Sequence, residues 1–485
     1  MHKPLHSLFF AALLFLALGL LSFSFPEEGL AVKEDLTLNF PSLQSLFSPK
    51  AEKKDISAII AMADAMDTVS FNVDTANVFA DSLIKEILIK DTVKKVLKTG
   101  LQYNNRSCLS GFFDALADIK KSNKSIRVLH YGDSQIEGDR ITDYLRLKLQ
   151  GQFGGQGPGL FSAMPIAQSI ITKVKASDGF DRYNTFTGKD KRVHHSNFGV
   201  LGGFARFAPY KNVSDSSQML SAEININTSK LGGVNATKYT KLKLFYGGSQ
   251  TKTWCEFYDG PALSGADSLE SNGYFRVKEY KVGLGSLSHS FKFKGKDSPD
   301  FYSFSLESDQ GIYVDNIGLR GSSGTFFHHI NSAQLKQFYD YLNVKLIILQ
   351  FGGNAIPSIK DGSIAVNYAG YLRSQISIIK KLAPQASIIF VGPADMSVKE
   401  GTEYKTHPQL ENTRNALKKI VLESGCAFFD MYDCMGGENS MPEWVEQKLA
   451  ATDYIHFSPQ GARKIATLFY SAIMNEYNAY LKSKK

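Results

Sequence analysis

The stretch Ile126-Arg127-Val128-Leu129-His130-Tyr131-Gly132-Asp133-Ser134-Gln135 decides the fold. Its first six residues are mostly apolar and β-favouring, which predicts a short strand that stops at Gly132. A helical pattern follows over residues 139–149. Ser134 therefore stands at a strand-to-helix turn, at the carboxyl end of a strand, where ligands of open α/β folds bind. The competing interpretation is that Ser134 only caps a helix, which is a frequent role for serine.

Strand and helix patterns also alternate in the last third of the chain. Further apolar strand patterns occupy 345–351, 387–391 and 426–429. Helical patterns separate or follow them at 332–342, 366–382, 408–423 and 460–480. Strands that alternate with helices indicate a parallel sheet covered on both faces. The sequence thus predicts an α/β domain built from two segments, 121–164 and 313–485.

Residues 165–312, between these two segments, have a different pattern. Short strand-like runs occur at 223–227, 240–246, 274–282 and 301–306, among many Gly, Ser, Asn and Asp turns. The region shows no long helical period, so it predicts an all-β sandwich of ordinary domain size. Loops of α/β folds lie on the surface and tolerate such an insertion.

Four aromatic residues of this insert have two interpretations. Tyr246, Trp254, Phe257 and Tyr258 either stack on sugar rings or fill the core of the sandwich. Core packing is the commoner use of such residues, and the stacking interpretation rests on analogy with other folds.

The N-terminal 25 residues resemble a leader. Lys3 supplies a positive start, Leu8 to Phe25 carries no charge, and Pro26-Glu27-Glu28 ends the run. This layout predicts a secretory signal peptide or an uncleaved membrane anchor, since the run nearly reaches spanning length. In either case we expect an exported protein, periplasmic or associated with the cell envelope.

Residues 26–120 read as a helical N-terminal region or linker without a catalytic signature. Helical spacing of apolar residues occurs at 91–98 and again at 109–119.

Charge and cysteine content restrict the function classes. The net charge of +8, from 55 basic and 47 acidic residues, comes without a dense Lys/Arg block. It predicts no nucleic-acid partner and permits association with an anionic surface polymer. Four cysteines (Cys108, Cys255, Cys426 and Cys434) are too few for a disulfide framework, so either a Cys426–Cys434 bridge or free thiols are expected. No metal-ligand cluster is visible, and we expect neither a metal nor a cofactor.

A second short motif, Asp453-Tyr454-Ile455-His456, lies just before the C-terminal helix. Ser458 and Pro459 mark the start of that helix as its N-cap and first residue. A spacing of three within a turn lets the Asp453 carboxylate meet one imidazole nitrogen of His456. The other nitrogen is then free to take a proton from a serine hydroxyl. An ordinary surface turn is the competing interpretation.

Two further segments offer donors for an oxyanion. Asn354, in Gly352-Gly353-Asn354, follows the predicted strand at 345–351, where its side-chain amide can face a developing negative charge. Gly321 follows another strand-like run, and a glycine lets its backbone N–H approach a reacting oxygen closely. Gly324 competes with Gly321 for this role.

Taken in chain order, these segments read Gly-Asp-Ser, Gly, Gly-x-Asn and Asp-x-x-His. The pattern resembles the SGNH, or GDSL-like, hydrolase superfamily. The resemblance implies a flavodoxin-like three-layer α/β/α fold with a parallel sheet, interrupted here by the all-β insert. It implies Ser134 as the nucleophile, His456 as the base and Asp453 as its orienting partner, with Ser134, Gly321 and Asn354 as the oxyanion hole. Gln135 and Ala355 depart from the common pattern, where Leu and Asp are frequent.

A narrower similarity concerns residues 130–135, 429–437 and 439–444. They look like the branch that includes periplasmic peptidoglycan O-acetylesterases, which carry a carbohydrate-binding-like β module inside the hydrolase fold. The resemblance implies a serine esterase that removes O-acyl, in particular O-acetyl, groups from a cell-wall or surface glycan.

Three other functions remain open on sequence alone. An O-acyltransferase to a polysaccharide would use the same residues. A non-catalytic glycan-binding protein would rely on the β insert alone, and a lipase would need an apolar lid that the sequence does not display.

Overall fold

The computed structural model describes residues 4–25, 30–33, 36–38, 40, 54–68, 100–186, 190–208, 210, 218–401 and 403–484. Its central sheet has six strands in the order β16-β4-β17-β18-β21-β3. The first five run parallel, and β3 pairs antiparallel with β21. The predicted parallel sheet is therefore confirmed. The bounds are β3 Leu101–Gln102, β4 Ser125–Gly132, β16 Gly311–Gly318, β17 Val344–Gln350, β18 Ser387–Val391 and β21 Ala427–Phe429.

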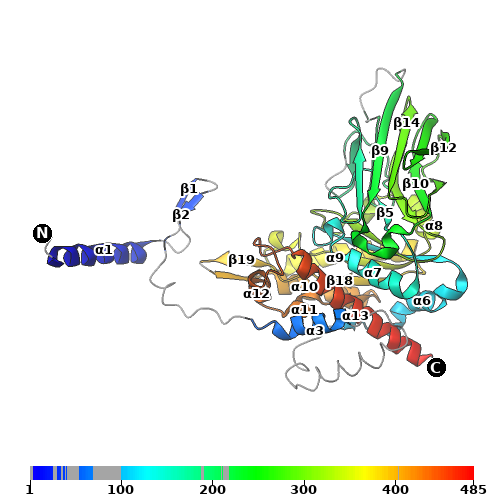
Figure 1. The fold of residues 1–485 in the computed structure, drawn as a ribbon. Coiled ribbons are helices and arrows are strands. Elements are labelled where there is room, and N and C mark those ends of the chain that lie inside the picture. The colour runs from blue at the N-terminus through cyan, green and yellow to red at the C-terminus, as the bar shows by residue number, and fades with distance from the viewer. Residues whose placement is uncertain are drawn as a thin grey trace.

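Helices cover both faces of this sheet (Figure 1). Alternate residues of β4 point to opposite sides, so that Val128 joins one hydrophobic core and Leu129 the other. The first core contains side chains of α3 Ser57–Thr68, α6 Ser110–Ser122, α7 Thr142–Phe153, α11 Met431–Met435, α12 Ser440–Glu446 and α13 Pro459–Ser483. The second core contains side chains of α8 Ser332–Tyr341, α9 Gly362–Leu382 and α10 Leu410–Glu423.

The antiparallel strands between α7 and β16 form two sheets. We call the one with strand order β13-β10-β15-β8-β7, with β5 on β15, the inner sheet, and the one with order β12-β11-β14-β9-β6 the outer sheet. The inner strands are β5 Gly159–Phe161, β7 Asp181–Asn184, β8 Gly203–Arg206, β10 Lys241–Gly247, β13 Arg276–Lys281 and β15 Asp300–Glu307. The outer strands are β6 Thr172–Ala176, β9 Leu220–Thr228, β11 Thr253–Asp259, β12 Ala262–Leu269 and β14 Ser288–Gly295. Leu244, Phe257, Phe291 and Phe304 fill the space between the two sheets, which makes this region the all-β part expected from the sequence.

The inner sheet also packs against the α/β part. Phe245 and Tyr302 turn away from the sandwich, with ring centroids 5.6 Å and 5.9 Å from that of Phe338 in α8. The buried guanidinium of Arg127, in β4, donates to Asp315 of β16 at 2.9 Å and also contacts Glu307 of β15. Apolar packing and a buried ionic contact therefore join the inserted strands to the parallel sheet.

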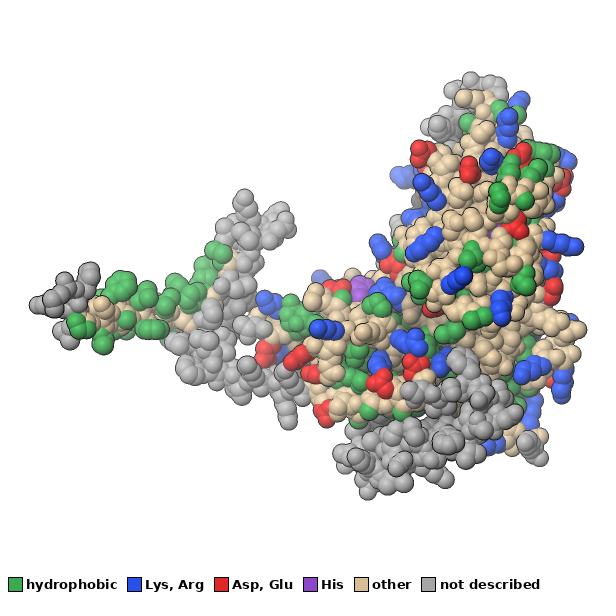
Figure 2. Space-filling view, viewed as in Figure 1, with side chains coloured by type: hydrophobic (Ala, Val, Ile, Leu, Met, Phe, Trp, Pro, Cys, Tyr) green, Lys and Arg blue, Asp and Glu red, His purple; other side chains and the backbone are tan. Residues whose placement is uncertain are grey.

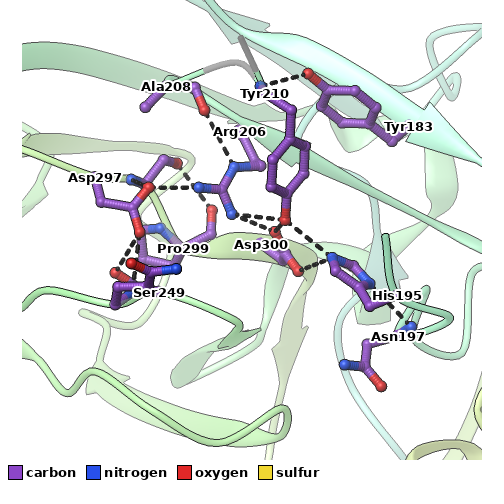
Figure 3. Close-up of polar contacts among 12 residues, drawn as sticks. Tyr183, His195, Asn197, Arg206, Ala208, Tyr210, Ser249, Asp297, Pro299 and Asp300 are labelled. Atoms are coloured by element: carbon purple, nitrogen blue, oxygen red, sulfur yellow. Dashed lines mark hydrogen bonds and ion pairs between the residues drawn. The ribbon is translucent and has the colours of Figure 1, made fainter. Parts of the chain in front are cut away.

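A buried polar cluster fastens β8 to the start of β15 (Figure 3). The Arg206 guanidinium donates to Asp300 Oδ1 at 2.7 Å and to Asp297 Oδ1 at 2.5 Å. Tyr210 OH donates to Asp300 at 3.3 Å, and His195 Nε2 lies 3.3 Å from Asp300 Oδ2. Because Asp300 is fully buried, these contacts offset the desolvation of its charge.

The segments that precede β4 contribute to the α/β core. β3 extends the central sheet, and α6 buries Phe112, Phe113 and Leu116 against it. The helical pattern expected at 109–119 is thus confirmed as α6, whereas the pattern at 91–98 lies outside the described residues. The division of the chain at 120/121, 164/165 and 312/313 stays a prediction.

The N-terminal helix α1, Pro4–Ser24, is exposed, and Figure 2 shows its hydrophobic side chains uncovered. Residues His6–Ser24 form the one helix of the described chain that is long and apolar enough to cross a membrane. A short hairpin, β1 Leu30–Lys33 and β2 Leu36–Leu38, follows it. The four cysteines are free thiols, including Cys426 and Cys434.

Candidate active site

Ser134 lies in the turn that leaves the carboxyl end of β4. The backbone N–H of Asp133 still donates to Gln350 O of β17 at 3.3 Å, so the strand pairing continues up to the turn. The Asp133 carboxylate then accepts the N–H of Gln135 at 2.9 Å and closes the chain around Ser134. A Cβ at Gly132 would lie 2.9 Å from the Ile136 side chain, so glycine permits this tight reversal. Ser134 is thereby held at the rim of the sheet and remains partly exposed.

His456 and Asp453 meet Ser134 from the opposite end of the chain. Ser134 Oγ is 2.8 Å from His456 Nε2, and His456 Nδ1 is 2.8 Å from Asp453 Oδ2. Asp453 Oδ1 also accepts the backbone N–H groups of Ile455 and His456, at 2.9 Å and 3.0 Å. One carboxylate therefore shapes the turn and fixes the orientation of the imidazole. The structure brings together all three residues of the predicted Ser-His-Asp group.

A hairpin supports this turn. The Tyr454 ring stacks on Tyr404, with centroids 3.6 Å apart, and the N–H of Ser397 donates to Tyr454 O at 3.0 Å. Both partners belong to the hairpin of β19 Ser397–Glu400 and β20 Glu403–Thr406. The helix α13 follows directly, where Ser458 Oγ accepts the N–H of Gly461 at 3.2 Å and Pro459 is the first helical residue, as expected.

Two carboxyl groups at this rim have opposite pKa shifts. Partial burial opposes ionisation of Asp453, but the hydrogen bonds from the backbone and ring of His456 outweigh it and hold the pKa of Asp453 below its ordinary value. Burial raises the pKa of Asp133 to about 6, despite the N–H of Gln135 and the nearby His456. Asp453 therefore stays ionised at neutral pH, as an orienting carboxylate must.

The two backbone N–H groups predicted as oxyanion donors belong to Ser134 and Gly321. In the part of the chain that the structure describes, neither the N–H of Ser134 nor that of Gly321 donates a hydrogen bond to the protein. By contrast, the N–H of Gly324 donates to Ser322 Oγ at 3.1 Å, and a Cβ at Gly324 would lie 2.7 Å from the Phe351 ring. Gly324 is thus engaged in packing, which favours Gly321 of the two.

Asn354 is connected to both neighbouring segments. Its Nδ2 donates to Ser322 O at 3.3 Å, next to Gly321. On the other side, a Cβ at Gly353 would lie 3.6 Å from Asp133 Oδ2, next to Ser134. The three strand ends that carry Ser134, Gly321 and Asn354 therefore meet at one rim.

Sequence reasoning missed two residues that join the Ser134 turn to the His456 turn. Gln135 Nε2 donates to Ile455 O at 2.6 Å, and its Oε1 accepts the N–H of Phe457 at 3.4 Å. The Arg140 guanidinium donates to Ser134 O at 2.5 Å and to Phe457 O at 3.4 Å. Gln135 was visible in the sequence only as a departure from a family pattern, and Arg140 gave no signal.

A cavity lies beside this rim. A cavity of about 130 Å³ lies between the end of β16 and the inserted strands, lined among others by Glu137, Leu319, Phe161 and Phe186. In the described ranges, no three His, Cys, Asp or Glu side chains converge as metal ligands would.

Part of the chain matches the model of a known protein family. The model of the GDSL-like lipase/acylhydrolase family matches residues 285–464, a span that holds Gly321, Asn354, Asp453 and His456. The chain contains a GDSL-like, or SGNH, hydrolase domain. The matched span omits Ser134, which precedes the inserted strands in the sequence. In the folded SGNH hydrolase, Ser134 nevertheless lies beside His456. The family identifies the protein as an enzyme that hydrolyses esters.

One solved structure agrees with this fold. It is described as a peptidoglycan O-acetylesterase in action and has a TM-score of 0.60 at 18% identity, over 78% of this hydrolase and 99% of that chain. A family two carbohydrate esterase from Clostridium thermocellum in complex with cellohexaose is more distant, with a TM-score of 0.24, 13% identity, and 53% and 92% of the two chains covered. A salicylyl-acyltransferase from a tetracycline biosynthetic pathway has a TM-score of 0.27 at 11% identity, with 64% and 98% covered. No curated protein matches the sequence.

Proposed function

We propose that this SGNH hydrolase removes O-acetyl groups from a cell-wall or surface glycan through an acyl-enzyme on Ser134. The observation that carries the proposal is the pair of 2.8 Å contacts that link Ser134 Oγ to His456 and His456 to Asp453. This is the arrangement that makes a serine hydroxyl nucleophilic at neutral pH.

In the first step, His456 Nε2 takes the proton of Ser134 while Oγ attacks the ester carbonyl carbon. The imidazolium that forms is stabilised by ionised Asp453 and then gives its proton to the leaving sugar oxygen. In the second step, a water molecule deprotonated by His456 attacks the acyl-enzyme, and acetate leaves as Ser134 regains its proton.

The negative charge on the carbonyl oxygen needs donors that are not already engaged. The backbone N–H groups of Ser134 and Gly321 meet this requirement, and Asn354 supplies a side-chain amide. Each such donor typically contributes about 3 kcal/mol to the lowering of the barrier.

Water rather than a second sugar is the acyl acceptor in this proposal. The side chains of His456 and Asp453 are 31% and 47% exposed. An acyltransferase has to keep water from its acyl-enzyme, and a base this accessible does not do so. The glycan as substrate is supported by the similarity of the fold to a structure described as a peptidoglycan O-acetylesterase.

Export to the cell envelope is part of the same proposal, because a cell-wall glycan lies outside the cytoplasm. The exposed apolar helix His6–Ser24 suits either a signal sequence or a membrane anchor.

Turnover of a small acetyl ester by the Ser134→Ala variant tests the proposal. We expect kcat to fall by about 10⁴-fold or more, whereas Ser374→Ala, on the exposed side of α9, should leave it unchanged. Acetate release from O-acetylated peptidoglycan, measured beside transfer of acetyl groups to added glycan, then tests the substrate and the acceptor. Undiminished turnover by Ser134→Ala would refute the proposed nucleophile.

A further inference from the structure

The outer sheet has a solvent-exposed face that the proposed catalysis does not use. We call it the outer face and define it by outward-pointing residues of four strands: Trp254, Glu256 and Tyr258 of β11, Ser290, Lys292 and Lys294 of β14, Ser221, Glu223 and Asn225 of β9, and Lys173 and Lys175 of β6. In Figure 2, basic side chains lie across the part of the molecule where Figure 1 places β9 and β14.

Two aromatic rings of this face are fixed in place. Trp254 is 44% exposed, whereas its strand neighbours Cys255 and Phe257 are buried in the sandwich. Trp254 Nε1 donates to Glu256 Oε1 at 3.3 Å, and Tyr258 OH donates to Glu256 Oε2 at 2.9 Å. One carboxylate thus restrains the indole and the phenol before any ligand arrives, which lowers the entropy that binding would cost.

Lysines flank these rings. Lys294 is paired directly with Trp254 across the strands, and Lys292 with Glu256. Neither lysine, nor Lys173 nor Lys175, forms an ion pair with a described carboxylate, and the Lys292 ammonium lies 4.9 Å from the Tyr258 ring centroid. The outer face therefore carries four lysines against two glutamates, Glu223 and Glu256, which leaves a net excess of positive charge.

A hollow of about 370 Å³ lies over this face, lined by Trp254, Glu256, Lys292 and Lys294 on one side and by Glu223 and Ser177 on the other. Its volume falls in the range of small-ligand sites. Hydroxyl, carboxylate and ammonium groups surround one exposed indole, and Ala222 and Phe293 complete the lining. A protein partner would need a wider apolar core than this, because interface centres are depleted of charged residues.

We propose that the outer face is a binding site for a glycan that carries carboxylate groups. A pyranose ring lies with its C–H face on the Trp254 indole. Cβ atoms of directly opposed residues are about 5 Å apart, so a carboxylate on that ring reaches the Lys294 ammonium. Lys292 and Lys175 then bind carboxylates of neighbouring sugars. Ser221, Ser290 and Asn225 bind hydroxyl groups.

Binding of oligogalacturonate by the full chain tests this site without relying on catalysis. The Ser134→Ala variant serves as the host, so that methyl-esterified oligogalacturonate, the uncharged form of the same ligand, is not hydrolysed. The chain contains two tryptophans, and Trp444 is fully buried, so a ligand-dependent change in emission reports on Trp254. Calorimetry supplies the affinities.

We expect the charged ligand to bind at least tenfold more tightly than the esterified one, with an advantage that shrinks as salt rises. Trp254→Ala and the pair Lys292→Gln with Lys294→Gln should each weaken binding at least tenfold. Trp254→Phe, which keeps an aromatic ring, should weaken binding by about threefold or less. Tyr371→Ala and the pair Lys120→Gln with Lys121→Gln, exposed sites elsewhere, should change nothing.

Equal affinity for the charged and esterified ligands, or undiminished binding by the Trp254→Ala and lysine variants, would overturn the site. Turnover of a small acetyl ester by Trp254→Ala in the wild-type background should stay at the wild-type rate. A failure of the esterase proposal would appear in the Ser134→Ala activity assay, and a failure of this site only in the binding assay.

Discussion

The side-chain amide of Gln135 donates to the main-chain oxygen of Ile455 at 2.6 Å. Its oxygen accepts the N–H of Phe457 at 3.4 Å, so one side chain holds the backbone on both sides of His456. Gln135 directly follows Ser134 in the chain. The distance from Ser134 Oγ to His456 Nε2 therefore depends on Gln135, although Gln135 touches neither reacting atom.

Loss of this contact should reduce the rate rather than substrate affinity. We expect Gln135→Leu to lower kcat for a small acetyl ester by about 10- to 100-fold with less than about a threefold change in KM, since small displacements of a base are costly. Gln135→Glu keeps an acceptor for the N–H of Phe457 but places a second oxygen against Ile455 O. Its kcat should therefore lie between those of wild type and Gln135→Leu.

Gln447→Leu is the matched control, because Gln447 is the exposed C-cap of α12 and its side-chain amide donates to Glu443 Oε1 at 2.8 Å. Unchanged kcat in Gln135→Leu, or a change confined to KM, would mean that the contact does not position His456.

Asp453 orients His456, and its replacement tests that role. Its pKa is held below the ordinary value by the hydrogen bonds from His456, so it is ionised throughout the neutral range. Asp453→Asn keeps the size of the side chain but removes the charge and favours the wrong imidazole tautomer. We expect kcat to fall by about 10³- to 10⁴-fold, measured by steady-state hydrolysis of a small acetyl ester. A loss below tenfold would show that orientation by the backbone alone suffices.

Much of the site follows from local sequence. The apolar run 126–131 sets the strand, and the strand end places Ser134; Ser458 and Pro459 set the start of α13 and so place the Asp453–His456 turn. Both are short-range effects. The fold of the α/β part then brings the Ser134 turn and the Asp453–His456 turn to the same rim.

The choice between Gly321 and Gly324 could not be read from the sequence. It depends on packing of Phe351 against Gly324 and on a hydrogen bond from Gly324 N–H to Ser322. The contact of Gln135 with Ile455 spans 320 residues, and no local pattern encodes it. Whether Trp254 or Phe257 is buried depends on which face of β11 meets the inner sheet. The alternation of residues along the strand leaves that choice open.

The two glycines provide a paired test of the oxyanion donor. Gly321 has φ +78° and a Cβ there would meet nothing within 4 Å, whereas a Cβ at Gly324 would meet the Phe351 ring. We expect Gly321→Ala to cost about 1 kcal/mol of stability from backbone strain and to lower kcat by about tenfold as its N–H shifts. Gly324→Ala should cost more, about 2–4 kcal/mol, through strain and overpacking.

Urea unfolding and kcat, measured on both variants, separate these effects. The activity of folded Gly324→Ala should stay within about threefold of wild type. A larger fall in kcat for Gly324→Ala than for Gly321→Ala, at temperatures where both are folded, would assign the donor to Gly324.

Asp133 should make the stability of this hydrolase depend on pH. Burial raises the pKa of Asp133 from 3.8 to about 6, so the folded state binds this proton more tightly than the unfolded state. The free energy of unfolding should therefore fall as pH rises from about 4 to about 6, by up to about 3 kcal/mol from this residue.

Asp133→Asn removes the titration and keeps an oxygen for the N–H of Gln135. Urea unfolding of both proteins at pH 4.5, 6 and 7.5 should show the variant gaining stability over wild type as pH rises. A constant difference across this range would contradict the raised pKa.

Arg127 should govern the stability of the inserted strands and the parallel sheet together. Its guanidinium is 3% exposed and lies between Asp315, fully buried, and Glu307, 4% exposed. Asp315 Oδ1 also accepts the N–H of Leu160 at 2.8 Å, at the start of the insert. Arg127→Met leaves two buried carboxylates without this cation, and we expect a loss of about 3–5 kcal/mol.

The loss should be smaller at pH 5 than at pH 8, because burial already raises the pKa of Asp315 and protonation relieves its unpaired charge. Adding Asp315→Asn to Arg127→Met should restore part of the stability for the same reason. If the insert were an independent domain, Arg127→Met would unfold one region in a separate transition. Because Phe245 and Tyr302 of the insert pack on Phe338 of α8, we expect a single transition by circular dichroism and tryptophan emission, shifted as a whole.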